Sequence, residues 1–425
     1  MVTVAVEGCC HGALNTIYES LKPDVELLLI CGDFQAIRNT TDLQTLNVPA
    51  KYRQPGDFPD YYSGVKKAPV LTIFIGGNHE CSSYMRELQY GGWVAPNIYY
   101  LGEFGSVWYK GIKITGASGI WNARSFFTKQ RLDYSLPYDA SSLRSVYHLK
   151  PKNLLKLLLS GRSDVCMSHD WPQGIWKFGN ERELLRKKKF FKEDMQSGKL
   201  GSPGARAALE RLAPRYWFSS HLHVKFTATF EKNVEVEVKP ETTDEIALDM
   251  DAESADNDEG ISGIDDNMSE EKRKRRKIIK KTSFLALDKC LKGRSFMDTL
   301  KIEPDEEHPS AKSGSLHYDA RGLAVQMVVE RFIKNNSDQW RALDPQVILN
   351  SASSRVALIE ELEKAVEEET TRLERKSPDL VVPNNFEITA PTMNTTPSPP
   401  LQYWPNPETQ HLCSKFKLLL PSHEA

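Results

Sequence analysis

Five short phrases rich in metal-ligand side chains each follow a stretch that is predicted to be a β-strand. They are Gly8-Cys9-Cys10-His11, Gly32-Asp33, Gly77-Asn78-His79-Glu80, Ser168-His169-Asp170 and Ser220-His221-Leu222-His223. Strand-like and helix-like runs alternate through the first 240 residues, which indicates an α/β domain. Ligands of such domains bind beyond the carboxyl ends of the strands. We therefore expect the five phrases to meet at one site.

The predicted elements follow from the spacing of apolar residues. Several strand-like runs are almost continuously apolar, which is typical of strands that are buried on both faces. The predicted strands are Val2–Val6, Glu26–Cys31, Val70–Gly76, Val107–Gly116, Asp164–Ser168, Tyr216–Ser219 and Val234–Val238. The predicted helices are Ala13–Leu21, Asn153–Leu159 and Ala205–Leu212.

Charge divides the chain into four parts. Residues 1–240 carry 31 Lys and Arg against 23 Asp and Glu, and residues 241–271 carry 13 acidic residues and no basic one. Residues 272–281 then carry eight Lys and Arg. The segment 241–281 is predicted to be a disordered linker, acidic and then basic. Its basic run is either a solvated charge run or a nuclear localisation signal, and we leave both interpretations open.

A smaller C-terminal domain is predicted over 282–413. Phe284–Asp288 and Ser315–Tyr318 have the character of short strands, and Ala320–Ile333 and Val356–Arg372 that of helices. The segment 376–409 is rich in Pro, Thr and Asn and is expected to be irregular. No apolar run reaches the ~20 residues that span a membrane. Seven cysteines without regular spacing favour a reduced intracellular compartment.

The phrases have the composition of a dinuclear metal site. Hydrolysis of a phosphate ester needs charge neutralisation and an activated water, which two divalent ions about 3.5–4 Å apart provide. Asp33 is the natural bridging carboxylate. One ion would take Asn78, His169 and His221, and the other Cys9, His11 and His223. Because residues i and i+2 of extended backbone point the same way, Cys9/His11 and His221/His223 are each expected to project as a pair.

The order of these phrases resembles the calcineurin-like metallophosphoesterase superfamily, whose pattern is D-x-H, G-D, G-N-H-E/D, H and G-H-x-H. Cys9 stands at the first Asp and Ser220 at a Gly. Cys9 and its surroundings are similar to one branch, the RNA lariat debranching enzymes. The resemblance covers residues 1 to about 230, and more loosely 282–413. Its further motifs are Tyr90–Gly102, Arg144–His148, Ser168–Pro172, Gly201–Pro203 and Tyr216–Phe226.

The resemblance implies a fold and an activity. The fold would be a four-layer sandwich of two mixed β-sheets flanked by helices, with the smaller C-terminal domain attached. The activity would be hydrolysis of the 2′–5′ phosphodiester at the branch point of excised intron lariats by a metal-activated hydroxide. His79 would be the general acid that protonates the departing 2′ oxygen. The segment 118–150 would be the lariat recognition loop.

Cofactor and partners follow from the same comparison and from Cys9. A thiolate ligand favours Fe²⁺ or Zn²⁺ over Mg²⁺, so we expect Fe²⁺ and Zn²⁺, with Mn²⁺ able to substitute. The expected partner is branched intron RNA, with no membrane and no obligate protein partner. The expected location is the nucleus, with possible shuttling to the cytoplasm.

Several side chains have open assignments. Trp121, Tyr134, Tyr138 and Tyr147 are candidates to stack on an unpaired base, although a core position is an equal alternative for Tyr147. Arg144 and Lys225 are further candidates for substrate binding, and an exposed solvated side chain is the alternative for Lys225. We expect Glu80 to orient His79, Asp170 to orient His169 or cap a turn, and Cys10 to pack inward.

Two other functions are weighed against debranching. The first is a phosphoesterase of the same superfamily that acts on nucleotides or phosphoproteins, against which Cys9 and the segment 118–150 argue. The second is a non-enzymatic scaffold that keeps the fold. A scaffold should have lost His79 or several ligands, and only Cys9 departs from the expected ligand types.

Overall fold

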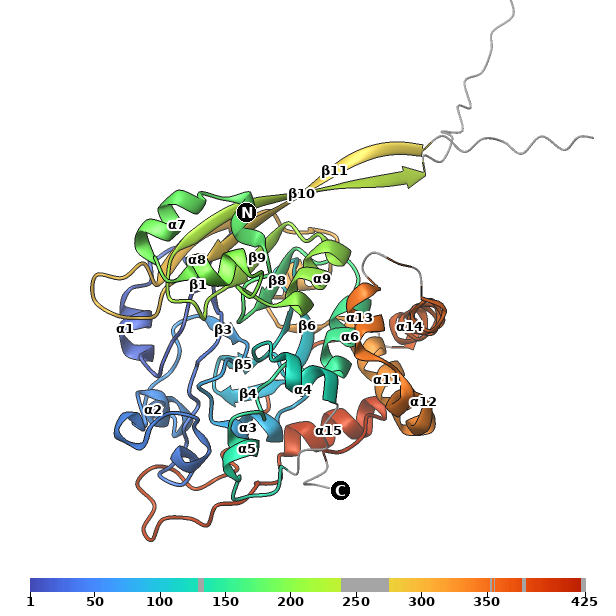
Figure 1. The fold of residues 1–425 in the computed structure, drawn as a ribbon. Helices are drawn as coiled ribbons and strands as arrows, with labels where there is room; N and C mark the ends of the chain where they lie inside the picture. Colours follow the sequence, from blue (N-terminus) through green and yellow to red (C-terminus); the bar gives the residue numbers. More distant parts are fainter. Residues whose placement is uncertain (129–133, 238–274, 352–353, 355, 377–379, 422–425) are drawn as a thin grey trace, which may run out of the picture. The chain divides into compact units, whose positions relative to one another are not determined.

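The computed structural model describes the chain except residues 129–133, 238–274, 352–353, 355, 377–379 and 422–425. Two mixed sheets form the centre of the described chain (Figure 1). The first has the strand order β12 (Met297–Ile302), β1 (Val2–Glu7), β2 (Leu27–Ile30), β3 (Leu71–Phe74), β5 (Ile98–Tyr100) and β4 (Gly92–Ala95). The second has the order β10 (Phe226–Glu237), β11 (Arg275–Ala286), β9 (Tyr216–Ser219), β8 (Val165–Ser168), β7 (Ile112–Ala117), β6 (Phe104–Tyr109) and β13 (His317–Tyr318).

Helices cover the outer faces of the two sheets. The helices that precede residue 150 are α1 (Leu14–Glu19), α2 (Phe58–Tyr62), α3 (Ser82–Glu87), α4 (Ala123–Thr128) and α5 (Ala140–Leu143). Those that follow are α6 (Pro151–Leu159), α7 (Glu181–Lys187), α8 (Phe191–Gln196), α9 (Pro203–Leu212), α10 (Ser310–Ser313), α11 (Ala320–Asn335), α12 (Ser337–Ala342), α13 (Pro345–Asn350), α14 (Ala357–Lys376) and α15 (Pro407–Phe416). Short 3-10 turns are η1 (Asp42–Thr45), η2 (Ala50–Tyr52) and η3 (Ile175–Phe178).

The alternation of side chains along each strand produces four layers. Val4 of β1 shares a buried cluster with Ile114 of β7 and Phe218 of β9, so the two sheets pack face to face. Ala5, one residue further along β1, instead belongs to a cluster that contains Ile17 of α1. A third cluster joins the second sheet to α6, α9 and α11. The predicted four-layer α/β sandwich is therefore confirmed.

The C-terminal segment enters both sheets. β12 pairs antiparallel with β1 from Val2↔Ile302 to Glu7↔Met297, β11 pairs parallel with β9, and β13 pairs antiparallel with β6. Residues 1–230 and 281–425 consequently form one compact unit, and residues 231–280 form a second. The expected smaller C-terminal domain thus shares its core with the part that carries the phrases.

Some predicted elements differ from the observed ones. The run Val107–Gly116 is not one strand but most of the β6–β7 hairpin, because Lys110 and Gly111 adopt positive φ angles of 47° and 73° that turn the chain. β4, β5 and β12 were not predicted as strands. The segment 118–150 contains α4 and α5, and 380–406 is largely irregular as predicted.

The predicted linker lies mostly outside the described residues, which resume at Arg275. Its last residues, 275–281, belong to β11 and are not irregular, so the basic run ends in a strand. Among the helices that the structure describes, none has both the length and the apolar character needed to cross a membrane.

Candidate metal centre

The five phrases meet where parallel strands end. Cys9 and His11 follow β1, Asp33 follows β2, Asn78 follows β3, His169 follows β8, and the last two histidines follow β9. Parallel strands of one sheet end at the same edge, and here the edges of both sheets face one another. Side chains that are more than 200 residues apart in sequence are therefore brought to a single place.

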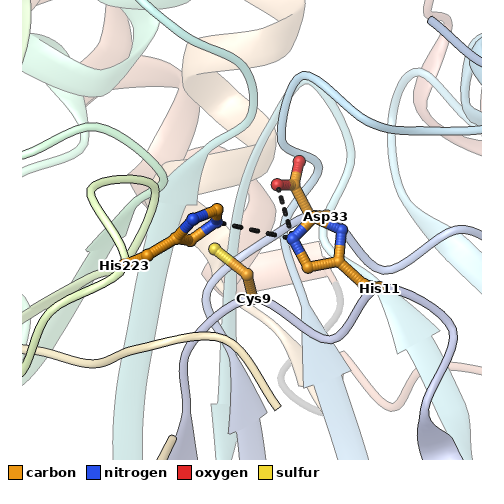
Figure 2. Close-up of side chains that lie close together, drawn as sticks. All are labelled: Cys9, His11, Asp33 and His223. Carbon is orange, nitrogen blue, oxygen red and sulfur yellow. Dashed lines mark hydrogen bonds and ion pairs between the residues drawn. The ribbon is translucent and has the colours of Figure 1, made fainter. Parts of the chain in front are cut away.

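Four ligand-type side chains form one compact group, shown in Figure 2. The ligand atoms of Cys9, His11, Asp33 and His223 all lie within 4.8 Å of one another. His11 Nε2 lies 3.6 Å from Asp33 Oδ2 and 3.5 Å from His223 Nε2. This is the set that the sequence assigned to one of the two ions.

The other oxygen of Asp33 faces the second set. His169 Nε2 lies 3.4 Å from Asp33 Oδ1, and the rings of His169 and His221 have centroids 5.0 Å apart. His169 Nδ1 donates to the carbonyl of Cys31 over 2.7 Å, which directs Nε2 toward Asp33. Asp33 therefore lies between the two groups, as a bridging carboxylate must.

Two buried polar atoms fit a metal ion rather than a protein partner. Asn78 Oδ1 and His169 Nε2 are buried and have no hydrogen-bond partner among the described residues. Buried polar atoms in folded proteins are nearly always satisfied. An amide oxygen and an imidazole nitrogen are also ordinary ligands of divalent ions. The side chains present thus fit two divalent ions that share Asp33.

The backbone at these ligands is not extended, as the pairing argument assumed. His11, Asp33, His221 and His223 have φ angles of 47°, 49°, 60° and 49°. Such left-handed conformations are costly for residues with a Cβ and gather at functional sites. Cys9 and His11 still converge, but His221 lies beside His169 while His223 lies beside His11. The prediction that His221 and His223 project together was therefore wrong.

Two glycines allow this close approach. A Cβ on Gly77 would lie 2.3 Å from Asp33 Oδ1 and 2.7 Å from His169 Cε1. A Cβ on Gly32 would lie 2.2 Å from His169 Nδ1, and Gly32 has a φ of 117°. No larger residue fits at either position without displacing Asp33 or His169.

The charges at the centre favour metal binding. Burial would raise the pKa of Asp33, but the charge and hydrogen bond of His169 and the charge of His11 hold it well below its ordinary value. Burial would lower the pKa of His169, but Asp33 raises it to about 9. Burial lowers the pKa of His223 to about 3, so this imidazole is neutral, which is the form that binds a metal.

Cys9 is a neutral thiol in the absence of a cation. Burial, followed by the charge of Asp33, raises its pKa well above the ordinary value. The backbone N–H of His221 donates to Cys9 Sγ over 3.3 Å, a contact that suits a thiolate. Cys10 packs on the other side of the strand end, in the cluster with Leu14 and Phe34, as predicted.

Glu80 and Asp170 do not have the partners that we expected. The Glu80 carboxylate accepts hydrogen bonds from the backbone N–H groups of Phe34, Gln35 and Gly77 over 2.7, 2.9 and 3.0 Å. It thus joins the Asp33 turn to the loop of the third phrase rather than orienting His79. Asp170 Oδ1 lies 3.5 Å from the Nε2 of His221, not beside His169.

His79 lies beside the centre with one ring nitrogen committed. Its backbone N–H donates to Asp33 Oδ1 over 2.8 Å, and its ring centroid lies 5.7 Å from that of His11. Its Nδ1 lies 3.0 Å from the carbonyl oxygen of Asn47. Because a carbonyl only accepts, Nδ1 carries the proton, and Nε2 is the nitrogen left for proton transfer. Sequence reasoning missed Asn47, since a backbone acceptor leaves no signature in the side chains.

Three of the predicted substrate-binding side chains are engaged within the chain. The ring of Tyr134 is covered by Arg86 and Lys150, at 4.6 and 5.2 Å from its centroid. The hydroxyl of Tyr138 lies 2.8 Å from that of Tyr403. Lys225 Nζ lies 2.7 Å from Asp298 Oδ2, so it is neither free nor at the centre.

The other three lie on the segment 118–150. Trp121 is half-buried against Phe126, and its backbone N–H donates to Asp170 Oδ2 over 2.6 Å. The hydroxyl of Tyr147 accepts from Asn47 Nδ2 over 2.6 Å. Arg144 is exposed and donates to the carbonyl of Ala140 in its own helix. Trp121 and Tyr147 are therefore the two that are linked to the centre, each through one intervening residue.

Comparison with known proteins agrees with this geometry. The family model of the calcineurin-like phosphoesterase matches residues 2–225. The family model of the lariat debranching enzyme C-terminal domain matches residues 279–420. The two matches together include every strand of the first sheet and both sets of ligands.

Full-length relatives extend the comparison. The lariat debranching enzyme of Danio rerio is 41% identical over 426 residues, which cover 98% of this chain and 66% of the relative. That of Homo sapiens is 39% identical over 429 residues, covering 98% and 69%. That of Schizosaccharomyces pombe is 36% identical over 426 residues, covering 91% and 89%. The chain belongs to the lariat debranching enzyme family, in which a calcineurin-like phosphoesterase domain is joined to a debranching-enzyme C-terminal domain.

Proposed function

We propose that this chain is a metal-dependent phosphodiesterase that hydrolyses the 2′–5′ bond at the branch point of lariat intron RNA. One observation carries the proposal: Cys9 lies in a compact group with His11, Asp33 and His223, at the position where related phosphoesterases place a carboxylate. The relatives that share this chain's full length are named lariat debranching enzymes.

Each conserved type of side chain has a distinct task in this proposal. Cys9, His11 and His223 hold one ion, Asn78, His169 and His221 hold the other, and Asp33 binds both. When bound, the two ions neutralise the charge of the phosphate and activate the attacking water. The side chains keep the two positions fixed and exclude bulk water from the buried carboxylate.

His79 supplies the proton for the leaving group. An alkoxide at the 2′ oxygen is a poor leaving group, so its departure requires protonation as the bond to phosphorus breaks. Nε2 of His79 is the nitrogen left for this transfer, since Nδ1 is committed to Asn47. The backbone N–H of His79 bonds to Asp33, which ties the acid to the ligand shared by both ions.

The metal pair that we propose is Fe²⁺ with Zn²⁺, with Mn²⁺ able to substitute. The thiolate of Cys9 is a soft ligand and favours these ions over Mg²⁺. Each site also offers two imidazoles, which suit iron and zinc. Elemental analysis of protein purified without oxygen tests the pair, and two equivalents of Mg²⁺ as the tightly held metal would contradict it.

Substrate recognition falls to the segment 118–150 in this proposal. Trp121 and Tyr147 lie on its two ends and are linked to the centre, and Arg144 is exposed between them. We further propose a nuclear location, with shuttling to the cytoplasm, on the strength of the basic run 272–281. Imaging the tagged full chain, with the Lys and Arg of 272–277 changed to Ala as the comparison, tests the location.

The activity is tested with one branched RNA and its linear counterpart. The full chain, with its metal content measured, should cleave the branch and leave the 3′–5′ bonds of both RNAs intact. His79→Ala should lower the rate on the branch about 10²–10⁴-fold while the metal content stays unchanged. Equal cleavage of the linear RNA would contradict the substrate assignment, and loss of metal in His79→Ala would contradict the role of His79.

A further inference from the structure

We propose that Asn47 and Tyr147 are positioning residues that hold His79 for proton transfer and connect it to the segment 118–150. This inference rests on the proposed function, because it assumes that His79 is the general acid. It assigns Tyr147, which the sequence offered as a base-stacking or core residue, to the alignment of the acid.

The contacts form a continuous chain of hydrogen bonds. His79 Nδ1 donates to the carbonyl oxygen of Asn47 over 3.0 Å, and Asn47 Nδ2 donates to the Tyr147 hydroxyl over 2.6 Å. The first contact orients the imidazole ring, and the second holds the residue that carries the acceptor. Three segments far apart in sequence thus define the orientation of one ring.

The main chain around Asn47 is held from one side only. Leu46 pairs with Cys81 in an antiparallel bridge, and Thr45 Oγ1 lies 3.1 Å from Ser83 Oγ. These contacts fix the residues that precede Asn47 against the start of α3. On the opposite side, Tyr147 is the side chain that bonds to the Asn47 amide. The hydroxyl of Tyr147 therefore has the task of completing the support.

Tyr147 itself is held firmly. The backbone N–H of Ile120 donates to the Tyr147 carbonyl over 3.3 Å, so the two ends of the segment 118–150 lie together. A Cβ on Gly119 would lie 2.0 Å from that carbonyl oxygen, and Gly119 has a φ of 98°. The glycine lets the strand end and Tyr147 approach closely.

The same segment reaches the centre at a second point. The backbone N–H of Trp121 donates to Asp170 Oδ2, and Asp170 Oδ1 lies 3.5 Å from His221 Nε2. RNA bound on this segment would therefore bear on the acid through Tyr147 and on a ligand through Trp121. Binding of the correct substrate would then favour the aligned position of His79, since small misplacements of a catalytic group cost large factors in rate.

The test compares two substrates that differ in their need for a proton. Branched RNA has an alkoxide leaving group, whereas bis(4-nitrophenyl) phosphate releases a nitrophenolate that leaves without protonation. Tyr147→Phe removes only the hydroxyl. It should lower kcat on branched RNA about 5-fold, the worth of one hydrogen bond, with little change in KM and little change on the nitrophenyl ester. Asn47→Ala should behave alike, and the double variant should be no worse than the more impaired single variant.

Controls separate alignment from general damage. Tyr90→Phe removes a tyrosine hydroxyl that bonds to the Leu419 carbonyl over 2.8 Å, away from the centre, and should leave both rates unchanged. Metal content and the unfolding midpoint of each variant are measured alongside. Equal loss on both substrates in Tyr147→Phe, or a raised KM with unchanged kcat, would overturn the alignment role.

The outcome for His79→Ala distinguishes the two levels of the argument. If that variant loses rate equally on both substrates, His79 is not the general acid and the proposed function fails at that point. If it loses rate selectively on branched RNA while Tyr147→Phe and Asn47→Ala do not, the general acid stands and the positioning pair is wrong.

Discussion

The sulfur of Cys9 sets the metal preference of the centre. A carboxylate at this position would be a hard ligand that accepts Mg²⁺ and Mn²⁺, whereas a thiolate selects softer ions. Cys9 is fully buried and lies within 4.8 Å of three other ligand atoms, so its replacement cannot be bypassed by a neighbouring side chain. The choice of ion is thus a property of a single atom.

We therefore expect Cys9→Ser and Cys9→Asp to differ. Serine keeps the size but is a poor ligand at neutral pH, so Cys9→Ser should hold about one ion per chain instead of two. Aspartate restores a hard ligand, so Cys9→Asp should regain a second ion with a preference shifted toward Mn²⁺. Elemental analysis after dialysis against equal Fe²⁺, Zn²⁺ and Mn²⁺ measures both. Unchanged stoichiometry in Cys9→Ser would exclude Cys9 as a ligand.

Two adjacent glycines offer a matched test of close packing at the centre. Gly77→Ala would place a methyl group 2.3 Å from Asp33 Oδ1, so Asp33 must move. Gly76→Ala would meet its nearest neighbour at an ordinary 3.4 Å. Neither glycine has a positive φ, so only the contact differs between them. We expect Gly77→Ala to lose both ions and activity while Gly76→Ala keeps them, and equal metal content would show that Asp33 is not confined here.

The sequence predicted the ligands of the centre but not the shape of the chain around them. The order of the phrases was enough to bring seven ligand-type residues and His79 to one edge. It did not reveal the positive φ angles of His11, His221 and His223, because these depend on turns that other segments hold in place. It also missed the contact of Asn47, whose acceptor is a backbone atom that every residue carries.

At the scale of elements, α11 is held to α6 by a buried charge cluster. Glu330 Oε1 of α11 lies 2.6 Å from Lys156 Nζ and 3.2 Å from Lys152 Nζ of α6. Burial would raise the pKa of Glu330, but the two lysines lower it to about 2. A carboxyl whose pKa is lowered in the folded state contributes stability above its unfolded pKa, which is lost as the pH falls through the folded value.

We expect Glu330→Gln to lower the free energy of unfolding at pH 7 by about 3–5 kcal/mol, because Lys156 is left buried without its charge partner. The difference from the unchanged chain should shrink as the pH falls from about 4.5 toward 2. Urea unfolding at pH 7 and at pH 4 and below measures it. Glu363→Gln is the control: that carboxylate pairs with Arg211 but is 37% exposed, so its loss should cost under about 1 kcal/mol. Equal costs would show that burial of Glu330 is not what matters.

Errors in the predicted elements have a common physical cause. The β6–β7 hairpin reads as one apolar run because its turn is only two residues long, at Lys110 and Gly111. β12 has no apolar alternation of its own and becomes a strand by pairing with β1 at the edge of the sheet. Strand formation there depends on the partner rather than on intrinsic preference. Strands with continuous apolar runs, such as β2 and β8, were predicted correctly for the converse reason.

At the scale of the whole molecule, the C-terminal segment holds the turn that carries Cys9. The N–H of Gly8 donates to the carbonyl of Phe296 over 2.9 Å, and the N–H of Cys290 donates to the carbonyl of Cys9 over 3.1 Å. A Cβ on Gly8 would lie 2.0 Å from the carbonyl oxygen of Asp288. The first phrase is thus sandwiched between its own sheet and a segment almost 300 residues away. The metal centre is complete only when both ends of the chain have folded together.

We therefore expect residues 1–240 alone to fail as a metal-binding unit. Without β12, the entirely buried strand β1 becomes an exposed apolar edge, which promotes aggregation. The matched control is the full chain with 241–271 replaced by a Gly/Ser linker of equal length, which keeps every contact described within residues 1–230 and 281–425. Size-exclusion chromatography with elemental analysis should show a monodisperse control with both ions and a truncated chain that aggregates or holds fewer. A soluble truncated chain with two ions would mean that β1 and the Cys9 turn are stable without their C-terminal partners, and the centre would then depend on the first 240 residues alone.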